Sequence, residues 1–200
     1  MRTKLLAVAL LSSLLIPNVL MAAKGADIAN EQCASCHSKD GNSQDGKVPN
    51  IAGFSKAGLE EMLQAYKVGD RQGDSYQAKG EKATDMNAVT KEMSNEDIEA
   101  VSTFFSTQKF KPAKQSSDAT LAKTGAALHK KSCEKCHSEQ GTSVEDDMAR
   151  LAGQWKPYLK NEFSKFSAGK RDMTKKMKKK FSPLSADEKK ALLEFYSSQN

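Results

Sequence analysis

The sequence predicts an all-α protein made of two tandem copies of one small domain. The first observation is an internal repeat: the run from Ile51 to Gly53 recurs as the run from Leu151 to Gly153, at an offset of 100 residues. The second is that helix start signals occur in both halves, whereas no segment shows the apolar and polar alternation that is typical of a strand. Tandem helical copies are the architecture that satisfies both observations.

The repeat extends along most of both halves. Five more residues match at the same offset: Lys56, Leu59, Tyr66, Gly69 and Arg71 match Lys156, Leu159, Phe166, Gly169 and Arg171. Farther on the offset falls to 91, so that Met86 matches Met177, and the first copy carries nine extra residues between Arg71 and Met86. These limits predict a first domain over residues 24–108, a linker rich in Lys, Ser and Pro over 109–120, and a second domain over 121–200.

Each copy is expected to hold three main helices. One leads into a cysteine motif, one covers residues 57–67 or 157–166, and one closes the domain. The closing helices have clear start signals, because Ser94 stands three residues before Asp97 and Ser185 stands three residues before Glu188. A serine and an acidic residue at this spacing form a capping box, which satisfies free amide groups at the start of a helix.

Every cysteine of the chain lies in one of two pentapeptides that the repeat relates. Cys33, Cys36 and His37 form the first motif, and the second is formed by Cys133, Cys136 and His137. On a helical turn, residues i and i+3 share a face, so that both thiols can reach the two vinyl groups of one porphyrin while the histidine at i+4 comes under the iron. The motifs therefore predict two covalently attached haem c groups, with His37 and His137 as axial ligands.

Three other uses of paired cysteines fit the sequence less well. A zinc site needs four ligands, and joining the two pairs into one site would span a hundred residues. A redox dithiol belongs to a βαβ setting, which the sequence does not show. Plain disulfides leave unexplained why a histidine follows both second cysteines.

The second axial ligand of each iron is predicted to be a methionine. Only His129 remains beyond the two motif histidines, and its place four residues before Cys133 suggests a surface residue that cannot reach across the porphyrin. Met86 and Met177 are the only methionines after residue 23 that recur at matching positions, so they are the predicted sulfur ligands. Met62 and Met93 are interpreted as core residues, whereas Met148 and Met173 are equally consistent with a loop role.

The N-terminal residues have the pattern of a secretory signal peptide. Arg2 and Lys4 precede an apolar run, and small residues follow near Ala22 and Ala23, so residues 1–23 are expected to be removed on export. The apolar run is too short for a comfortable membrane span, and no later stretch approaches one. We therefore expect a periplasmic protein without a membrane span.

Charge is divided unevenly between the copies. Residues 24–110 carry 10 basic and 14 acidic residues, a net charge of −4, whereas residues 111–200 carry 19 basic and 11 acidic residues, a net charge of +8. Five lysines surround Met177. They are interpreted either as a docking patch for an acidic redox partner or as a solvated face, and binding of nucleic acid is not expected of an exported haem protein.

Each half resembles a class I cytochrome c, and the tandem resembles the dihaem cytochromes of the c-four type. A closer resemblance, to the cytochrome subunit of flavocytochrome c sulfide dehydrogenase, rests on the linker and the second half. It is carried by the runs Phe110 to Ser116, Thr124 to Ala126, Leu128 to His129, Cys133 to His137, Leu151 to Leu159 and Lys175 to Met177.

The second resemblance implies a heterodimer in which a separate FAD subunit oxidises sulfide and passes electrons to this chain and on to a downstream acceptor. This chain has no glycine-rich nucleotide fingerprint and no spare cysteine, so it is expected to bind no flavin and to be no enzyme on its own. The resemblance also implies a pseudo-twofold axis with the haem propionates near the domain interface. Arg71 and Arg171 are then candidate propionate partners, although they fit ordinary surface arginines equally well. A free-standing dihaem carrier is the alternative function.

Overall fold

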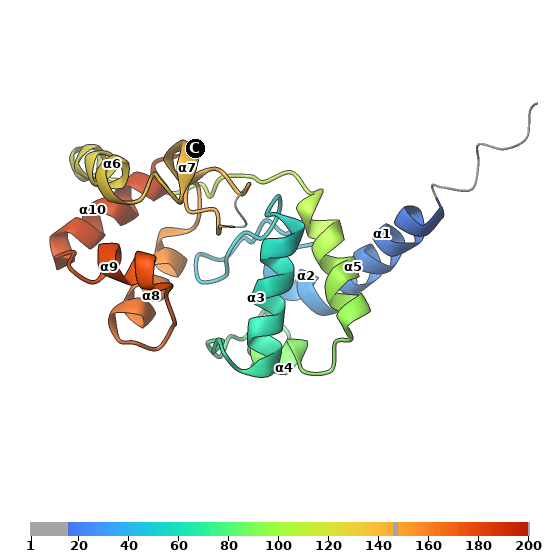
Figure 1. Cartoon of the computed structure of the whole chain (residues 1–200). Helices are drawn as coiled ribbons and strands as arrows, with labels where there is room; N and C mark the ends of the chain where they lie inside the picture. The colour runs from blue at the N-terminus through green and yellow to red at the C-terminus, as the bar shows by residue number, and fades with distance from the viewer. Residues whose placement is uncertain (1–15, 146–147, 200) are drawn as a thin grey trace, which may run out of the picture.

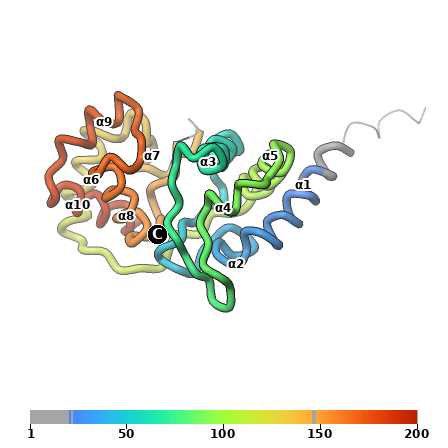
Figure 2. Tube along the Cα trace, turned by 90° about the horizontal axis from the view of Figure 1, so that it is seen from below, coloured from blue at the N-terminus to red at the C-terminus, as the bar shows by residue number. Residues whose placement is uncertain are grey.

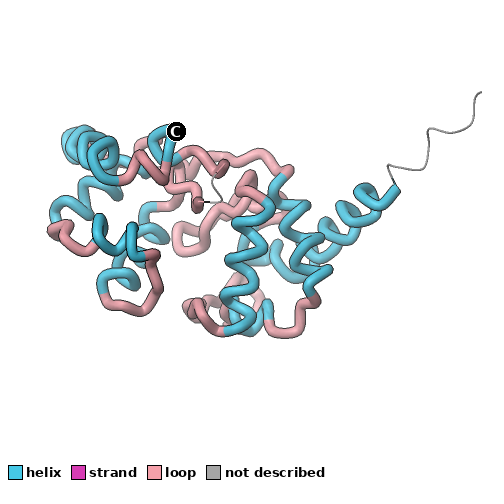
Figure 3. The backbone as a smooth tube through the Cα atoms, viewed as in Figure 1, coloured by secondary structure: helices cyan, strands magenta, loops and turns pink. Residues whose placement is uncertain are grey.

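The computed structural model describes residues 16–145 and 148–199. Its helices form two halves that lie side by side, α1 to α5 in one and α6 to α10 in the other (Figure 1). Within the described residues, loops join the helices and the one β-type pairing is an isolated antiparallel bridge between Tyr76 and Thr84 (Figure 3). The expected all-α class is confirmed.

The first half contains the N-terminal helix, a long central helix and a closing helix. The elements, in chain order, are α1 (Ile16–Ile28), the π-helical turn η1 (Ala29–Cys33), α2 (Ala34–His37), α3 (Lys56–Val68), α4 (Met86–Thr90) and α5 (Asn95–Ser106). Helix α1 begins inside the segment expected to be a signal peptide, whose first fifteen residues lie outside the described part. Removal of this segment therefore stays a prediction. No described helix is long and apolar enough to cross a membrane.

The second half repeats this order with small changes. Its elements are α6 (Ala119–Ser132), α7 (Ser138–Gly141), α8 (Lys156–Ser167), α9 (Lys175–Phe181) and α10 (Ala186–Ser197). The capping boxes expected at Ser94 and Ser185 are both formed, and they start α5 and α10. The nine additional residues of the first half lie in the loop between α3 and α4, which projects from the helices in Figure 2.

In each half the first and last helices cross at a glycine. A Cβ atom on Gly25 would lie 2.1 Å from the carbonyl oxygen of Ala100, and one on Gly125 would lie 2.1 Å from that of Ala191. Only glycine lets two helix backbones come this close. The crossings fix α1 on α5 and α6 on α10, and each half builds its apolar core around the crossing, with Phe105 buried in one and Phe195 in the other.

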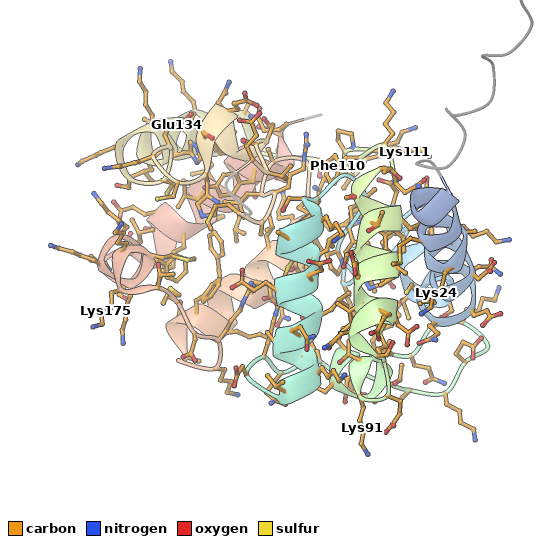
Figure 4. All side chains as sticks on the ribbon, turned by 45° about the vertical axis from the view of Figure 1, so that its right-hand side comes forward. Lys24, Lys91, Phe110, Lys111, Glu134 and Lys175 are labelled. Carbon is orange, nitrogen blue, oxygen red and sulfur yellow. The ribbon has the colours of Figure 1, made fainter. Side chains whose placement is uncertain are left out.

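The segment between the halves is not helical, but both halves hold it. The side-chain amide of Asn42 donates to the carbonyl of Lys109 at 3.0 Å, and the side-chain amide of Asn50 donates to that of Lys111 at 2.9 Å. On the other side, the amide of Ala113 donates to the carbonyl of Gly153 at 2.8 Å. Phe110 and Lys111, at the start of this segment, lie near the C-terminal end of α5 in Figure 4.

Direct contacts also join the two halves. The backbone amide of Asn50 donates to Oε1 of Gln154 at 3.0 Å, and both residues are 1% exposed. The indole nitrogen of Trp155 donates to the carbonyl of Ser43 at 3.2 Å. Because buried polar groups are costly to leave without partners, these bonds favour one relative orientation of the halves.

Candidate haem sites

The first motif lies at the end of η1 and in α2. His37 is 8% exposed, and its Nδ1 atom lies 3.0 Å from the carbonyl oxygen of Pro49. Burial lowers the pKa of His37, against a smaller opposing effect of that carbonyl bond. A neutral imidazole held through Nδ1 keeps Nε2 free, and this is the state in which histidine binds a metal.

Within the described residues, neither cysteine of the first motif is paired in a disulfide, so both sulfur atoms are available for thioether bonds. Burial, and to a lesser extent the neighbouring Cys36, raise the pKa of the Cys33 thiol to about 12. A reactive dithiol needs a lowered pKa, so this environment argues against the redox reading. Among the described residues, no group of three or more His, Cys, Asp or Glu side chains is placed to hold a metal ion.

A hollow of about 460 Å³ opens beside Cys36. One wall is formed by Ser35 and Cys36, and the other is formed by Ala78, Gly80, Glu81, Lys82 and Thr84 of the loop that contains the additional residues. The hydroxyl of Tyr76 in the same loop donates to Oδ2 of Asp45 at 2.9 Å and so holds the loop on the first half. The Cys36 sulfur beside this hollow and the oriented imidazole of His37 fit the covalent haem attachment that the motif predicts.

The second motif is a turn rather than a helix. Helix α6 ends at Ser132, and the amide of His137 donates to the carbonyl of Cys133 at 2.9 Å. This i+4 bond keeps the helical spacing that the motif requires, although Glu139 and Gln140 directly beyond it have left-handed backbones. Burial, followed by the neighbouring His129, lowers the pKa of His137, against a smaller opposing effect of the Ala149 backbone.

The two predicted sulfur ligands begin short helices at matching positions. Met86 is the first residue of α4, whose N-cap Asp85 accepts a hydrogen bond from the amide of Ala88 at 2.8 Å. Met177 is in the first turn of α9, and its amide donates to the hydroxyl of the N-cap Thr174 at 3.2 Å. Both side chains are partly buried. Ligation of the two irons by these methionines stays a prediction.

The remaining methionines have other surroundings. Met93 is 4% exposed in the first core, and Met62 packs against that core. Met173 packs against the second core, whereas Met148 is 38% exposed. The interpretation of Met62 and Met93 as core residues therefore agrees with the structure.

His129 was expected at the surface, and this expectation was wrong. The residue is 1% exposed; its Nδ1 atom lies 2.9 Å from the hydroxyl of Tyr196 and its Nε2 atom lies 2.6 Å from Oε2 of Glu134. The sequence reasoning also missed the roles of Glu134 and Tyr196. The repeat held a signal, because the residue that matches His129 in the first copy is Ala29, an apolar residue that is fully buried.

Arg71 and Arg171 are not ordinary surface arginines. Arg71 is 8% exposed, and Nη2 donates to Oε2 of Glu162 at 3.0 Å. Arg171 of the second half donates to the same carboxylate oxygen through Nη1. Glu162 is 4% exposed and was not singled out in the sequence, since its counterpart in the first copy is Met62. A role of either arginine toward a propionate stays a prediction.

Comparison with known proteins identifies the family. The family model "Cytochrome c" matches residues 22–109. Cytochrome c4 of Stutzerimonas stutzeri is 31% identical over 150 residues, which cover 70% of this chain and 69% of that protein. Cytochrome c4 of Azotobacter vinelandii is 28% identical over 148 residues, with the same shares covered.

Solved structures of related proteins have the same fold as this chain. The reduced recombinant cytochrome c4 from Pseudomonas stutzeri superposes with a TM-score of 0.72 at 27% identity, over 89% of this chain and 97% of that one. Thiosulfate dehydrogenase from Marichromatium purpuratum gives a TM-score of 0.70 at 22% identity, over 89% of this chain and 40% of that chain, and shows a shared fold.

The fold is therefore that of two tandem class I cytochrome c domains. The chain belongs to the cytochrome c family and has the two-domain organisation of cytochrome c4. Two covalently bound haem c groups and an electron-transfer role, rather than an enzymatic one, come with this membership. Each haem supplies a one-electron couple, and the residues around it tune its potential and control access to it.

Proposed function

We propose that this chain is a periplasmic dihaem electron carrier with His37 and Met86 on the first iron and His137 and Met177 on the second. Cys33, Cys36, Cys133 and Cys136 form the thioether bonds, with one haem in each of the domains 24–108 and 121–200. The observation that carries this proposal is that burial lowers the pKa of the motif histidine in both halves, which buried hydrogen bonds join to each other.

The further proposal is that a separate FAD subunit, which oxidises sulfide, supplies the electrons. It is supported by the resemblance of the linker and the second half to the cytochrome subunit of flavocytochrome c sulfide dehydrogenase. The alternative is a free-standing carrier, which the likeness to cytochrome c4 over both domains favours. The two functions share every haem ligand and differ only in the electron donor.

Helix α9 supports an exit for electrons at the second haem. Phe181 is buried against Phe163 and Phe166, at ring-centroid distances of 5.1 and 5.7 Å, and so anchors the helix. Met177, one turn earlier, shares the inward face of α9 with Phe181, as residues i and i+4 do. The five lysines of α9 are exposed: Lys175, Lys176, Lys178, Lys179 and Lys180. Lys175 points outward in Figure 4.

A charge-reversal experiment tests this exit. Holoprotein is reduced and then oxidised either by ferricyanide, an anion, or by a cationic cobalt(III) complex, at rising salt concentration. Exposed charges are screened over about 8 Å at physiological ionic strength, so oxidation by the anion should slow as salt rises. Combined Lys178→Glu and Lys179→Glu should slow ferricyanide and favour the cobalt complex.

The matched control is combined Lys114→Glu and Lys123→Glu, the same charge change at exposed positions outside α9. An equal effect of both pairs would show that net charge, rather than α9, controls the reaction.

The electron donor is tested separately by adding sulfide and the purified flavoprotein to this chain. Reduction of the haems supports the complex with the flavoprotein. A stable monomer, purified from its native host without flavin and inert to sulfide, would support the free-standing carrier.

A further inference from the structure

The buried carboxylate of Glu162 joins the two halves asymmetrically. It comes from α8 of the second half, and it accepts hydrogen bonds from an arginine of each half, Arg71 and Arg171. The Nζ atom of Lys165 lies 3.3 Å from Oε1 of Glu162. Burial would raise the pKa of Glu162, but Arg171, Arg71 and Lys165 together lower it, so the group is a carboxylate at neutral pH. The carboxylate of Glu162, in the second half, thus binds Arg71 of the first half.

Arg71 is fixed at both ends. Its guanidinium lies over the ring of Tyr66, at 4.7 Å from the centroid, and Nη2 is 3.4 Å from the hydroxyl of Tyr158 in the second half. Its backbone amide donates to the carbonyl of Ala65 at 3.0 Å. Its carbonyl oxygen accepts a hydrogen bond from Nδ2 of Asn87 at 2.8 Å. The side chain therefore faces the second half, while the backbone is bonded to α4.

Asn87 extends this connection to the predicted sulfur ligand, because it directly follows Met86. Besides the Arg71 carbonyl, Nδ2 of Asn87 reaches the carbonyl of Tyr66 at 2.6 Å, and Oδ1 accepts from the amide of Gly73 at 2.8 Å. A Cβ atom on Gly73 would lie 2.7 Å from the amide nitrogen of Met86, so the two backbones are in contact. The start of α4 is therefore bonded to residues 71–73, and Glu162 binds the first of these residues, Arg71.

The second copy is built differently. At the repeat offset of 91, the residue that follows its methionine is Lys178, which is exposed in α9 and lacks the side-chain amide with which Asn87 makes these bonds. The carboxylate that holds Arg71 is likewise not duplicated, since Met62 stands in the matching position. The contacts that lead from Glu162 at the interface between the halves to a predicted sulfur ligand therefore end at Met86 of the first copy.

We propose that Glu162 and Asn87 are positioning residues for Met86: the second half of the molecule, through Arg71, holds the sulfur ligand of the first haem in place. The inference rests on the proposed ligation by Met86. Docking of the halves then stabilises the iron–sulfur bond of the first haem selectively, and a change at the interface weakens that bond before it affects the second haem.

The test reads the sulfur-to-iron absorption band of each haem separately. In ferric holoprotein with Met177→Ala the remaining band belongs to the first haem, and with Met86→Ala it belongs to the second. Glu162→Gln is added to both backgrounds, because the amide keeps the shape but leaves two guanidinium groups without their counter-charge. The first band should then be lost at a lower temperature than in its parent, and the second should keep its midpoint.

Three further variants sharpen the test. Glu61→Gln, on the exposed face of α3, is the matched control and should leave both bands unchanged. Glu162→Asp keeps the charge and should restore part of the first band's midpoint. Asn87→Ser should lower that midpoint without touching the interface, and it remains informative if Glu162→Gln does not fold.

The outcomes separate this inference from the proposed ligation. If Glu162→Gln shifts neither band, or shifts both equally, Glu162 only holds the halves together and the inference is wrong. If Met86→Ala leaves the full band in place, the ligation itself is wrong, whatever Glu162 does.

Discussion

Single residues distinguish the second haem motif from the first. Beside the second motif, His129 bridges Tyr196 and Glu134, whereas the matching residues of the first copy are Ala29, Phe105 and Ala34. One copy thus has a polar network where the other has apolar contacts. Buried polar groups near a haem alter its potential, so the two sites are chemically inequivalent although their predicted ligands are alike.

His129→Ala places the residue of the first copy into the second. The change leaves the buried hydroxyl of Tyr196 without its imidazole partner and opens a cavity. We expect the free energy of unfolding to fall by about 1–3 kcal/mol, the usual cost of stranding a buried polar group. Urea unfolding of the holoprotein measures the change, and Lys130→Ala, on the exposed side of the same helix, is the control. Equal stability of the two variants would contradict the structure around His129.

At the scale of elements, each half depends on one helix crossing. Gly25 and Gly125 bring α1 onto α5 and α6 onto α10, and in both places the atom that a side chain would meet first is a backbone carbonyl oxygen. Backbone cannot move aside as the end of a flexible side chain can. The crossings therefore require glycine more strictly than the surrounding core requires any one apolar residue.

Gly125→Ala should separate α6 from α10. Overpacking at a tight contact costs about 1–3 kcal/mol, and we expect at least that loss in the free energy of unfolding. Thermal unfolding followed by circular dichroism measures it. Ala127→Leu, which adds a larger side chain at an exposed position of α6, should change stability by no more than about 0.5 kcal/mol. A variant Gly125→Ala as stable as the parent would show that the helices do not cross as described.

Over the whole molecule, the sequence predicts the features that both copies share, but it does not predict the contacts that join the two copies. The helical class, the cysteine motifs and the capping boxes at Ser94 and Ser185 follow from short spacings, because local geometry decides them. The contact between Arg71 and Glu162 links residues far apart in the chain, and no periodicity marks it. The same holds for the bonds between Asn50 and Gln154. Contacts of this kind depend on how the halves dock, and only the structure gives that.

The surface expectation for His129 failed for a related reason. Position along α6 shows which way a residue faces, but burial depends on the closing helix α10, which supplies Tyr196 from the far end of the domain. Comparing His129 with Ala29 would have indicated a buried position, because repeats preserve burial even where they change the residue.

The central claim is that each half holds its own haem between a motif histidine and a matching methionine. The most direct measurement is the sulfur-to-iron absorption band of ferric holoprotein in four forms: parent, Met86→Ala, Met177→Ala and the double variant. Each single variant should lose one haem's share of the band and the double variant should lose all of it, with both haems still covalently attached by mass spectrometry. A band that survives in the double variant, or that Met93→Leu or Met173→Leu removes instead, would contradict the claim.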